Sequence, residues 1–560
     1  MVRKALAEHT KEELIQMVCH LKECKKFGLI WEDKSEKVAR DCQEKLPILK
    51  ESGDKAINLA ENQPTNIIIE GDNYHALSVL NYTHPGKIDV IYIDPPYNTG
   101  NQDFIYDDKI VDSEDCFRHS KWLSFMEKRL RLAKDVLSKD GVIFISIDDN
   151  EQAYLKVLCD EIFDESNFVG IFKWNKVAKA PSLSKLIRNK YEYILCYKRK
   201  NITKLYGKKS YNTQGPVWHN PNKPKELYFA EQSIRIRKSF KKGSKSEKYS
   251  VELLDDLIEE NGHNKNPVRI IAASAWGQEK INKYIKDGKT FEIKNDIGTM
   301  YADISSKDNF ISPADIINKE ECDVDNNTDA SEKLKKLGVN FNNPKPVSLV
   351  KYLIKMVCYE NKKATILDFF AGSGTTGQAV LELNQSDNGS RQFILCTNNE
   401  NQIAEQVTYP RIKTVITGVR PDGLQYGDGI PANVRYFKTD FVPRNKTNDK
   451  LRREIAPLCT DMIKIRENCF EQVLDNGQLK VFKNARGLTA LIFDDGDLTP
   501  YIQEIEKLDT NAPVFLYVFS YNNDSRDYEI PTTTRHKYRS QPIPEGVLSV
   551  YRRIFKPKGD

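Results

Sequence analysis

Apolar residues from Asn66 onward fall into short runs that alternate with amphipathic segments. Continuous apolar runs are typical of buried strands, and apolar positions that recur every three or four residues are typical of helices. The pattern predicts strands over 66–70, 88–93, 141–147 and 191–197, and helices over 74–80, 122–137 and 151–163. Strands separated by helical crossovers predict a parallel α/β sheet.

This alternation stops near Lys198 and resumes at Val347. The second part predicts helices over 347–358 and 376–383, and strands over 364–369 and 392–396. We therefore expect one α/β domain in two pieces, 61–199 and 336–444, that is interrupted by an insertion over 200–335. The insertion lacks the alternation and ends in the polar stretch 320–332, which is typical of a linker.

The two ends of the chain have different patterns. Apolar positions at helical spacing (Leu14, Met17, Val18 and Leu21) predict a helical segment within residues 1–60. Residues 445–560 mix helical and strand patterns, including an apolar run over 514–519, and predict a C-terminal α+β domain.

Composition indicates a soluble globular protein. The chain has 560 residues, of which 39% are hydrophobic and 29% charged, and this length suggests about three or four domains. The longest apolar runs are too short to cross a bilayer, and the N-terminus lacks a secretory pattern, so we expect a cytoplasmic protein without a membrane partner. The 11 cysteines show neither a C-x-x-C pair nor zinc-ligand spacing, so we expect no metal.

The strongest chemical signal is Asp94-Pro95-Pro96-Tyr97, directly after the predicted strand 88–93. Two prolines end a strand and stiffen the loop that follows it. The Asp94 carboxylate and the Pro95 carbonyl could accept the two N–H groups of an aromatic amine and aim its lone pair at a methyl donor. Tyr97 offers a face on which an extruded base could stack, a contact worth roughly 1–3 kcal/mol. The alternative is a proline-rich turn that carries Asp and Tyr by chance.

A second signal is the turn 368–376, Asp-Phe-Phe-Ala-Gly-Ser-Gly-Thr-Thr, between a predicted strand and a predicted helix. Its glycines allow close approach of a ligand, and a helix N-terminus favours a carboxylate such as that of S-adenosylmethionine. The third glycine and the acidic partner of a dinucleotide site are missing, which argues against NAD. Because both motifs lie at carboxyl ends of strands, a cofactor at one can meet a substrate at the other.

Together these motifs resemble the amino-methyltransferases of the β circular permutation, and more narrowly the modification (Mod) subunit of type III restriction–modification systems. Further matching segments are 71–77, 94–100, 144–149, 343–346, 436–440 and 550–555. The resemblance implies a Rossmann-like, circularly permuted methyltransferase fold that uses S-adenosylmethionine. In that family, Asp before Pro-Pro-Tyr usually marks adenine as the target, which implies N6 methylation of a flipped adenine in duplex DNA.

The resemblance also implies roles for individual residues. The catalytic residues would be Asp94, Pro95, Pro96 and Tyr97. The cofactor would be bound by Asp72 at its adenine end, by Glu400 at its ribose, and around its methionine part by Pro344, Lys345, Pro346, Asp368, Phe370, Gly372, Gly374 and Thr375. The acid that usually follows the strand 392–396 directly is replaced here by Thr397, so Glu400 is the candidate in its place.

Residues 204–248 carry 12 lysines and arginines against three glutamates, with aromatic residues between them. Basic residues could hold phosphates and aromatic residues could fill opened base steps, although a charge run is often only a solvated face. In the family this insertion is the target-recognition domain. The candidate DNA-binding residues are Arg235, Arg237, Lys238, Lys241 and Lys242.

Two motifs are absent. Gly288-Lys289-Thr290 resembles the end of a phosphate-binding loop, but position 283 is Lys where the first glycine should be. Without that loop or a nuclease motif, restriction would require a separate Res subunit that carries the translocase and nuclease. The resemblance further implies a homodimer. Two alternatives stay open: an amino-cytosine methyltransferase, and a catalytically silent DNA-recognition subunit.

Overall fold

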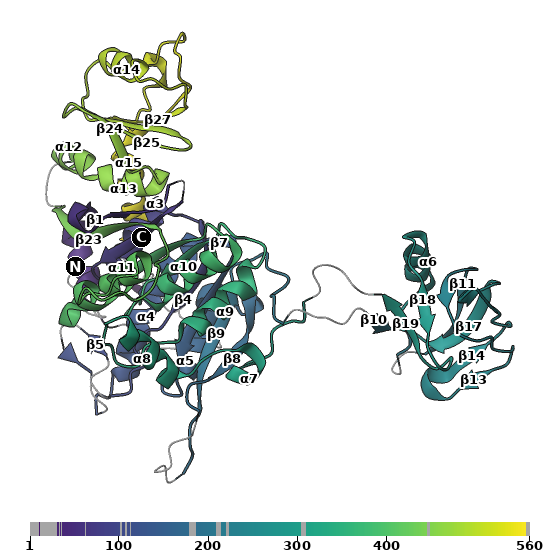
Figure 1. Cartoon of the computed structure of the whole chain (residues 1–560). Coiled ribbons are helices and arrows are strands. Elements are labelled where there is room, and N and C mark those ends of the chain that lie inside the picture. The colour runs from purple at the N-terminus through teal and green to yellow at the C-terminus, as the bar shows by residue number, and fades with distance from the viewer. Residues whose placement is uncertain are drawn as a thin grey trace. The chain divides into compact units, whose positions relative to one another are not determined.

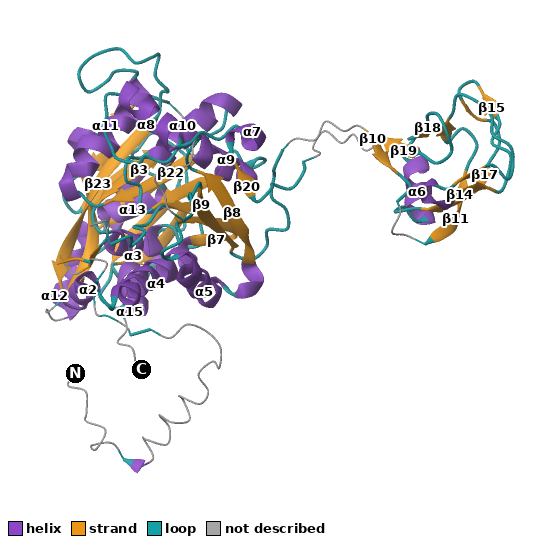
Figure 2. Cartoon of the chain, turned by 90° about the horizontal axis from the view of Figure 1, so that it is seen from below, coloured by secondary structure: helices purple, strands orange, loops and turns teal. Residues whose placement is uncertain are grey.

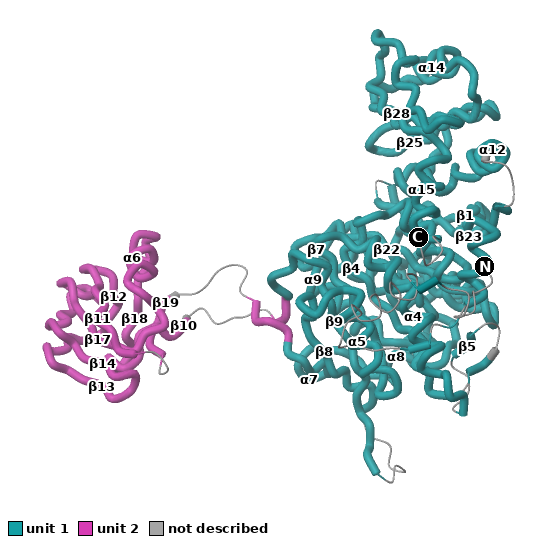
Figure 3. Tube along the Cα trace, turned by 180° about the vertical axis from the view of Figure 1, so that it is seen from behind, with its two compact units in different colours: residues 1–205, 314–560 teal, residues 206–313 magenta. Residues whose placement is uncertain are grey.

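The chain folds into two compact units, one formed by residues 1–205 and 314–560 and the other by residues 206–313 (Figure 3). The computed structural model describes residues 10–11, 31–32, 34, 36–61, 63–100, 104–106, 109–111, 114–178, 186–208, 214–219, 223–303, 310–444 and 448–555. Within these residues, no helix combines the length and the apolar character needed to cross a bilayer.

The larger unit is built on an eleven-stranded sheet (Figure 1). Its order is β1 (Lys45–Glu51), β23 (Asn433–Pro443), β3 (Thr65–Glu70), β22 (Gln392–Thr397), β21 (Thr365–Asp368), β4 (Ile88–Ile93), β7 (Leu137–Ile147), β9 (Tyr191–Lys198), β8 (Phe168–Asn175) and β20 (Ile316–Ile317), and β2 (Ile57–Asn58) also pairs with β23. The strands from β23 to β7 are parallel. The predicted α/β class is confirmed, but the sheet is not wholly parallel, since β1 and β9 run antiparallel to their neighbours.

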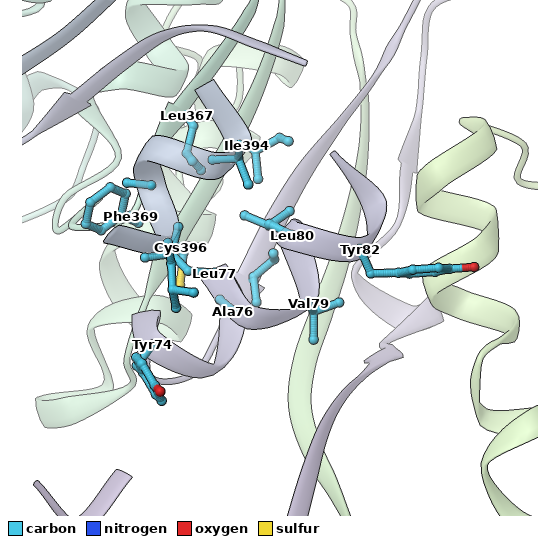
Figure 4. Close-up of a cluster of buried hydrophobic side chains, with 14 of the residues drawn as sticks. Tyr74, Ala76, Leu77, Val79, Leu80, Tyr82, Leu367, Phe369, Ile394 and Cys396 are labelled. Atoms are coloured by element: carbon cyan, nitrogen blue, oxygen red, sulfur yellow. The ribbon is translucent and has the colours of Figure 1, made fainter. Parts of the chain in front are cut away.

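Helices cover both faces of this sheet (Figure 2). The helices α3 (Asn73–Thr83), α4 (Arg118–Val136) and α5 (Gln152–Phe163) share one apolar core, and α9 (Val347–Cys358), α10 (Thr375–Asp387) and α11 (Tyr409–Thr417) share the other. In β3, Ile67 and Ile69 belong to the first core and Ile68 to the second, because successive side chains of a strand point to opposite faces. Figure 4 shows Leu77 and Leu80 of α3 beside Leu367 and Ile394 of the sheet.

Residues 314–336 differ from the prediction of a linker within the insertion. They form β20, α7 (Lys319–Cys322) and α8 (Asn327–Lys336), and β20 pairs with β8 in the main sheet. A capping box at Asn326 starts α8, and the apolar Leu334 packs into the core of the larger unit. The compact insertion is therefore shorter than the predicted 200–335.

Described segments toward both ends of the chain also belong to the larger unit. Within the predicted helical segment 1–60, α2 (Lys37–Glu44) is a helix but β1 is an edge strand paired with β23, while Leu14, Met17, Val18 and Leu21 lie outside the described residues. The C-terminal segment is mixed α and β, as predicted. It contains α12 (Asn448–Leu458), α13 (Thr460–Glu467), α14 (Thr499–Glu506) and α15 (Glu545–Ile554), and a sheet of β24 (Glu471–Asp475), β25 (Leu479–Asn484), β26 (Gly487–Ile492), β27 (Val514–Phe519) and β28 (Tyr538–Ile543).

The smaller unit is mainly β structure around its own core. Its helix is α6 (Gln278–Lys286), and its strands are β10 (Gln214–Pro216), β11 (Pro224–Phe229), β12 (Ile234–Arg235), β13 (Lys245–Ser246), β14 (Val251–Leu253), β15 (Glu259–Glu260), β16 (His263–Asn264), β17 (Val268–Ala273), β18 (Phe291–Ile293) and β19 (Met300–Asp303). The large buried side chains Trp218, Phe229 and Phe291 belong to this core. Residues 206–313 therefore have a hydrophobic core independent of the larger unit.

Candidate active site

Four of the parallel strands end side by side at one edge of the main sheet, in the order β3, β22, β21, β4. Gly71 and Asp72 follow β3, the segment 398–400 follows β22, the glycine turn follows β21, and Asp94 follows β4. The chain leaves β21 toward β22 on one side and leaves β4 toward β7 on the other, so the strand order reverses between β21 and β4. Ligands of open α/β sheets bind at such a point.

The loop after β4 is anchored at several atoms. The indole of Trp122 in α4 donates a hydrogen bond to the carbonyl of Pro96 at 2.7 Å. Asn98 has a positive φ of 56° and its amide donates to the buried carboxyl of Glu151 at 2.5 Å. Pro95 is buried, and the exposure of its carbonyl stays a prediction. These contacts fix the loop on both sides of Tyr97.

Asp94 bonds to both halves of the interrupted domain. One carboxylate oxygen accepts from the Tyr97 hydroxyl at 2.9 Å, and the other accepts from Lys345 Nζ at 2.9 Å. The backbone carbonyl of Lys345 in turn accepts from the Thr375 hydroxyl at 3.2 Å, at the start of α10. The structure thus brings three predicted segments, 94–97, 344–346 and 368–376, into one hydrogen-bonded network.

Glu192 and Lys176 belong to the same network, although the sequence analysis did not identify them. Glu192, at the start of β9, accepts from the Tyr97 hydroxyl at 3.1 Å and lies 3.3 Å from the ammonium groups of Lys345 and Lys176. Burial alone would raise the pKa of Glu192, but the two lysines outweigh it and lower that pKa. A charged residue inside the apolar run 191–197 was the only signal in the sequence.

The glycine turn is held by polar contacts within itself. Asp368 is buried and accepts from the backbone N–H of Phe370 at 3.0 Å and from the hydroxyl of Thr376 at 2.5 Å. Burial raises the pKa of Asp368 to about 7, and these two hydrogen bonds oppose the rise. Gly372 and Gly374 have φ of 48° and 79°, a region that favours glycine.

Arg411 of α11 is a third residue that could not be identified from the sequence. Its guanidinium donates to the Ser373 hydroxyl and to the Thr375 hydroxyl, both at 2.9 Å, and its side chain is buried. It forms no ion pair with any residue that the structure describes. Burial lowers the pKa of Arg411 to about 10. A buried cation that forms no ion pair in the described part of the chain therefore lies beside the N-terminus of α10.

The other predicted cofactor residues lie along the same edge. Asp72 caps α3 by accepting from the Tyr74 N–H at 2.7 Å, and it lies 3.3 Å from the buried Arg129. Glu400 is exposed beyond β22. Pro344 and Pro346 are buried on either side of Lys345, and Pro346 is the N-cap of α9.

Comparison with known proteins agrees with this arrangement. The family described as DNA methylase matches residues 88–408, more than half of the chain. The chain belongs to the DNA methylase family. That match includes Asp94, Lys345 and the glycine turn, so the network described above lies within the family's own region, as does the smaller unit.

Individual relatives of the family are similar over most of the chain. The StyLTI Mod subunit of a type III restriction–modification enzyme from Salmonella typhimurium is 31% identical, over 65% of this chain and 60% of that protein. The type II methyltransferase M.KpnI from Klebsiella pneumoniae is 30% identical, over 66% of this chain and 90% of that protein. The chain thus matches less than two thirds of the Mod subunit's length. Among solved structures, PvuII DNA methyltransferase (cytosine-N4-specific) covers 73% of this chain and 97% of its own, with 12% identity and a TM-score of 0.32, a weak likeness.

The candidate DNA-binding residues lie on the smaller unit. Arg235 and Arg237 alternate with the buried Ile234 and Ile236, so both arginines point away from the core. Lys238, Lys241 and Lys242 are exposed as well, and none of these five cations forms an ion pair with a described residue. Their role in binding DNA stays a prediction.

The aromatic residues of the insertion are only partly available to a ligand. Trp218 and Phe229 are buried in the core of the smaller unit, whereas Tyr228 is 48% exposed. The expectation that the interleaved aromatics fill base steps is therefore wrong for Trp218 and Phe229, because they supply the apolar core that these short strands need.

His75 of the larger unit has a structural contact: its ring contacts the carbonyl of Val38 at 3.2 Å.

Proposed function

We propose that the protein transfers a methyl group from S-adenosylmethionine to the N6 amino group of adenine in duplex DNA. The single observation that carries this proposal is the network from Asp94 through Lys345 to Thr375. It joins the loop that suits an aromatic amine to the turn that suits an amino-acid cofactor. The names of the relatives, a Mod subunit and a type II methyltransferase, agree with this activity.

The residues of the sheet edge fit this cofactor. The first backbone N–H groups of α10 and the buried Arg411, which has no ion pair in the described part of the chain, suit the methionine carboxylate. Asp72 and Glu400 follow the neighbouring strands β3 and β22, where the adenine and the ribose would lie, and Phe370 offers an apolar ring. The bound cofactor would supply a methyl group on a sulfonium centre.

The contacts of Asp368 favour a role other than the predicted binding of the cofactor. Both of its oxygens are engaged inside the turn, by Phe370 N–H and by the Thr376 hydroxyl. We infer that it fixes the shape of the turn, whereas the glycines and Thr375 approach the cofactor.

The loop Asp94–Tyr97 would act on the base. Flipping an adenine out of the duplex costs a few kcal/mol, and stacking on the Tyr97 ring would offset part of this. Asp94 and the Pro95 carbonyl would accept the two N–H groups of the amine, which orients its lone pair toward the methyl group. The amine loses its proton after transfer, to water or to Asp94.

The smaller unit would recognise the DNA site through its unpaired cations, Arg235, Arg237, Lys238, Lys241 and Lys242. We propose that the protein acts as the modification and recognition subunit of a type III system, as a homodimer with a Res subunit as its partner. The similarity to the StyLTI Mod subunit supports this assignment.

The test uses purified protein, S-adenosylmethionine and duplex DNA amplified from genomic fragments, which carries no methylated bases. Nucleoside mass spectrometry should detect N6-methyladenine after incubation with the wild-type protein. Asp94→Ala should reduce this product by at least about 10³-fold, because it removes an acceptor that acts at the reacting amine. Calorimetry should show unchanged affinity for S-adenosylhomocysteine.

Asp89→Asn is the matched control, since Asp89 lies on the same strand at its other end and accepts from the Thr365 N–H, which asparagine can still do. If the product is N4-methylcytosine, the target base is cytosine and not adenine. DNA binding without any methyl transfer would identify a silent recognition subunit instead.

A further inference from the structure

Glu192 contacts the same two groups that occupy Asp94. The Tyr97 hydroxyl lies 2.9 Å from Asp94 Oδ1 and 3.1 Å from Glu192 Oε2. Lys345 Nζ lies 2.9 Å from Asp94 Oδ2 and 3.3 Å from Glu192 Oε2. One oxygen of Glu192 is therefore within reach of both donors that engage the two oxygens of Asp94.

The four charges of this cluster balance. Asp94 and Glu192 are opposed by Lys345 and Lys176, and Glu192 and Lys345 are both buried, with side chains 7% and 9% exposed. Burial alone would lower the pKa of Lys345, but Asp94 and Glu192 outweigh it and raise that pKa. The charge of this buried ammonium group is therefore stabilised by its neighbouring carboxylates. If Asp94 turns to another partner, Glu192 is the carboxylate that remains beside Lys345.

Two aromatic rings lie near the Lys345 ammonium group. It lies 5.0 Å from the centre of the Tyr97 ring and 5.9 Å from the centre of the Trp174 ring. Trp174 of β8 lies opposite Glu192 of β9 in the strand pairing, so the ring and the carboxylate come from the same hairpin. Both distances lie within the range of a cation–π attraction, which adds to the attraction between the ammonium and Glu192.

Each oxygen of Asp94 already accepts one hydrogen bond from a protein donor, so an N–H of a substrate amine has to share that oxygen with Tyr97 or Lys345. The proposed function requires at least one of these oxygens to accept an N–H of the base. We propose that Glu192 is a positioning residue that takes over the Lys345 ammonium and the Tyr97 hydroxyl, and so frees Asp94 to bind the amino group of the target base. This inference rests on the proposed function.

The test compares single-turnover methyl transfer by the wild-type protein and Glu192→Gln, with saturating DNA and cofactor. Glutamine keeps the size of the side chain but removes its charge, so Lys345 should stay on Asp94. We expect the rate to fall about 10- to 100-fold, the loss typical for removal of one charged hydrogen-bond partner, while affinities for S-adenosylhomocysteine and DNA change less than about threefold.

A double-mutant cycle separates this role from a structural one. In a Lys345→Met background there is no ammonium to take over, so Glu192→Gln should lower the remaining rate much less than it does alone. Tyr193→Phe is the matched control on the same strand, because it loses one hydrogen bond to Asp149 and does not touch the cluster. It should keep the wild-type rate.

Three results would overturn the inference: an unchanged rate in Glu192→Gln, an equal loss in both backgrounds, or an equal loss in Tyr193→Phe. If the glutamine protein does not fold, as judged by its melting temperature, Glu192→Asp replaces it, since the shorter side chain keeps the charge but withdraws from Lys345. A wild-type protein that transfers no methyl group to DNA would instead refute the proposed function, and this inference with it.

Discussion

Glu151 is a buried carboxyl group that supports the loop of Asp94–Tyr97. Its side chain is fully buried, and its Oε1 is bonded by the Asn98 amide at 2.5 Å and by the His119 ring at 2.7 Å. Its Oε2 and the Asn98 Oδ1 have no hydrogen-bond partner among the described residues. Burial raises the pKa of Glu151 to about 8, and Asp148 adds to the rise while Asn98 and Arg118 oppose it.

This shift makes folding stability depend on pH in a defined direction. Because the pKa is raised from 4.5 to about 8, the folded protein holds a proton on Glu151 that the unfolded chain has released at neutral pH. The contribution is complete below pH 4.5 and is lost as the pH rises through 8. Each pKa unit corresponds to about 1.4 kcal/mol, so the loss is on the order of 5 kcal/mol.

The perturbation is Glu151→Gln, whose amide cannot ionise but still offers an oxygen to Asn98. We expect the free energy of unfolding of Glu151→Gln to lack the decrease with pH that Glu151 causes in the wild type. At pH 9 it should therefore exceed the wild-type free energy of unfolding by up to about 5 kcal/mol. The larger unit has roughly 450 residues, for which about 1 kcal/mol corresponds to about 1 °C in melting temperature. The difference between the two proteins should therefore grow by about 4 °C from pH 5 to pH 9, because a small part of the loss has already occurred at pH 5.

The assay measures melting temperatures of both proteins at pH 5, 7 and 9 by fluorescence. All other titrating groups are shared, so the difference between the proteins isolates Glu151. Glu161→Gln is a matched control, because Glu161 lies in α5, which begins directly after Glu151, and its side chain is 39% exposed. Melting temperatures of wild type and Glu151→Gln that fall in parallel with rising pH would refute the reasoning.

Two further predictions concern the ligands. Replacing Arg235, Arg237 and Lys238 together by alanine should weaken DNA binding and reduce the slope of log K against log salt by up to about 3, since each phosphate contact contributes about 0.9. An unchanged slope would mean that this stretch faces solvent. Asp72→Asn and Glu400→Gln should each weaken the binding of S-adenosylhomocysteine about tenfold in calorimetry, which is the usual loss for one charged hydrogen bond. Wild-type affinity in the Glu400→Gln protein would mean that Glu400 does not bind the ribose.

Much of the larger unit's fold could be predicted from the sequence, because its central strands are short continuous apolar runs between amphipathic helices. The strand 88–93 and the helix 347–358 have the predicted bounds. The prediction failed where the local pattern is weak. Nothing in Lys45–Glu51 shows that it pairs with β23, nearly 400 residues away, and that pairing makes it an edge strand of the main sheet. The acidic segment 320–332 looked like a linker because its apolar positions are few and widely spaced.

The candidate site was predictable at its motifs but not at the residues that support them. Asp94 and the glycine turn stand out because an unusual local sequence follows each strand. Glu192 and Arg411 do not, since their importance comes only from contacts with residues distant in the sequence. A single buried charge in a strand or a helix becomes informative when the fold shows which polar atoms surround it.

Lys345 explains how a site divided by an insertion can form one reaction centre. Its backbone bonds to Thr375 on the side of the glycine turn, and its ammonium bonds to Asp94 on the other side. Both contacts come from within the larger unit. The unit of residues 206–313, inserted between the two halves, can therefore change in sequence without disturbing these contacts. Under the proposed function, site recognition and methyl transfer would then change independently of each other, because they would depend on residues with separate hydrophobic cores.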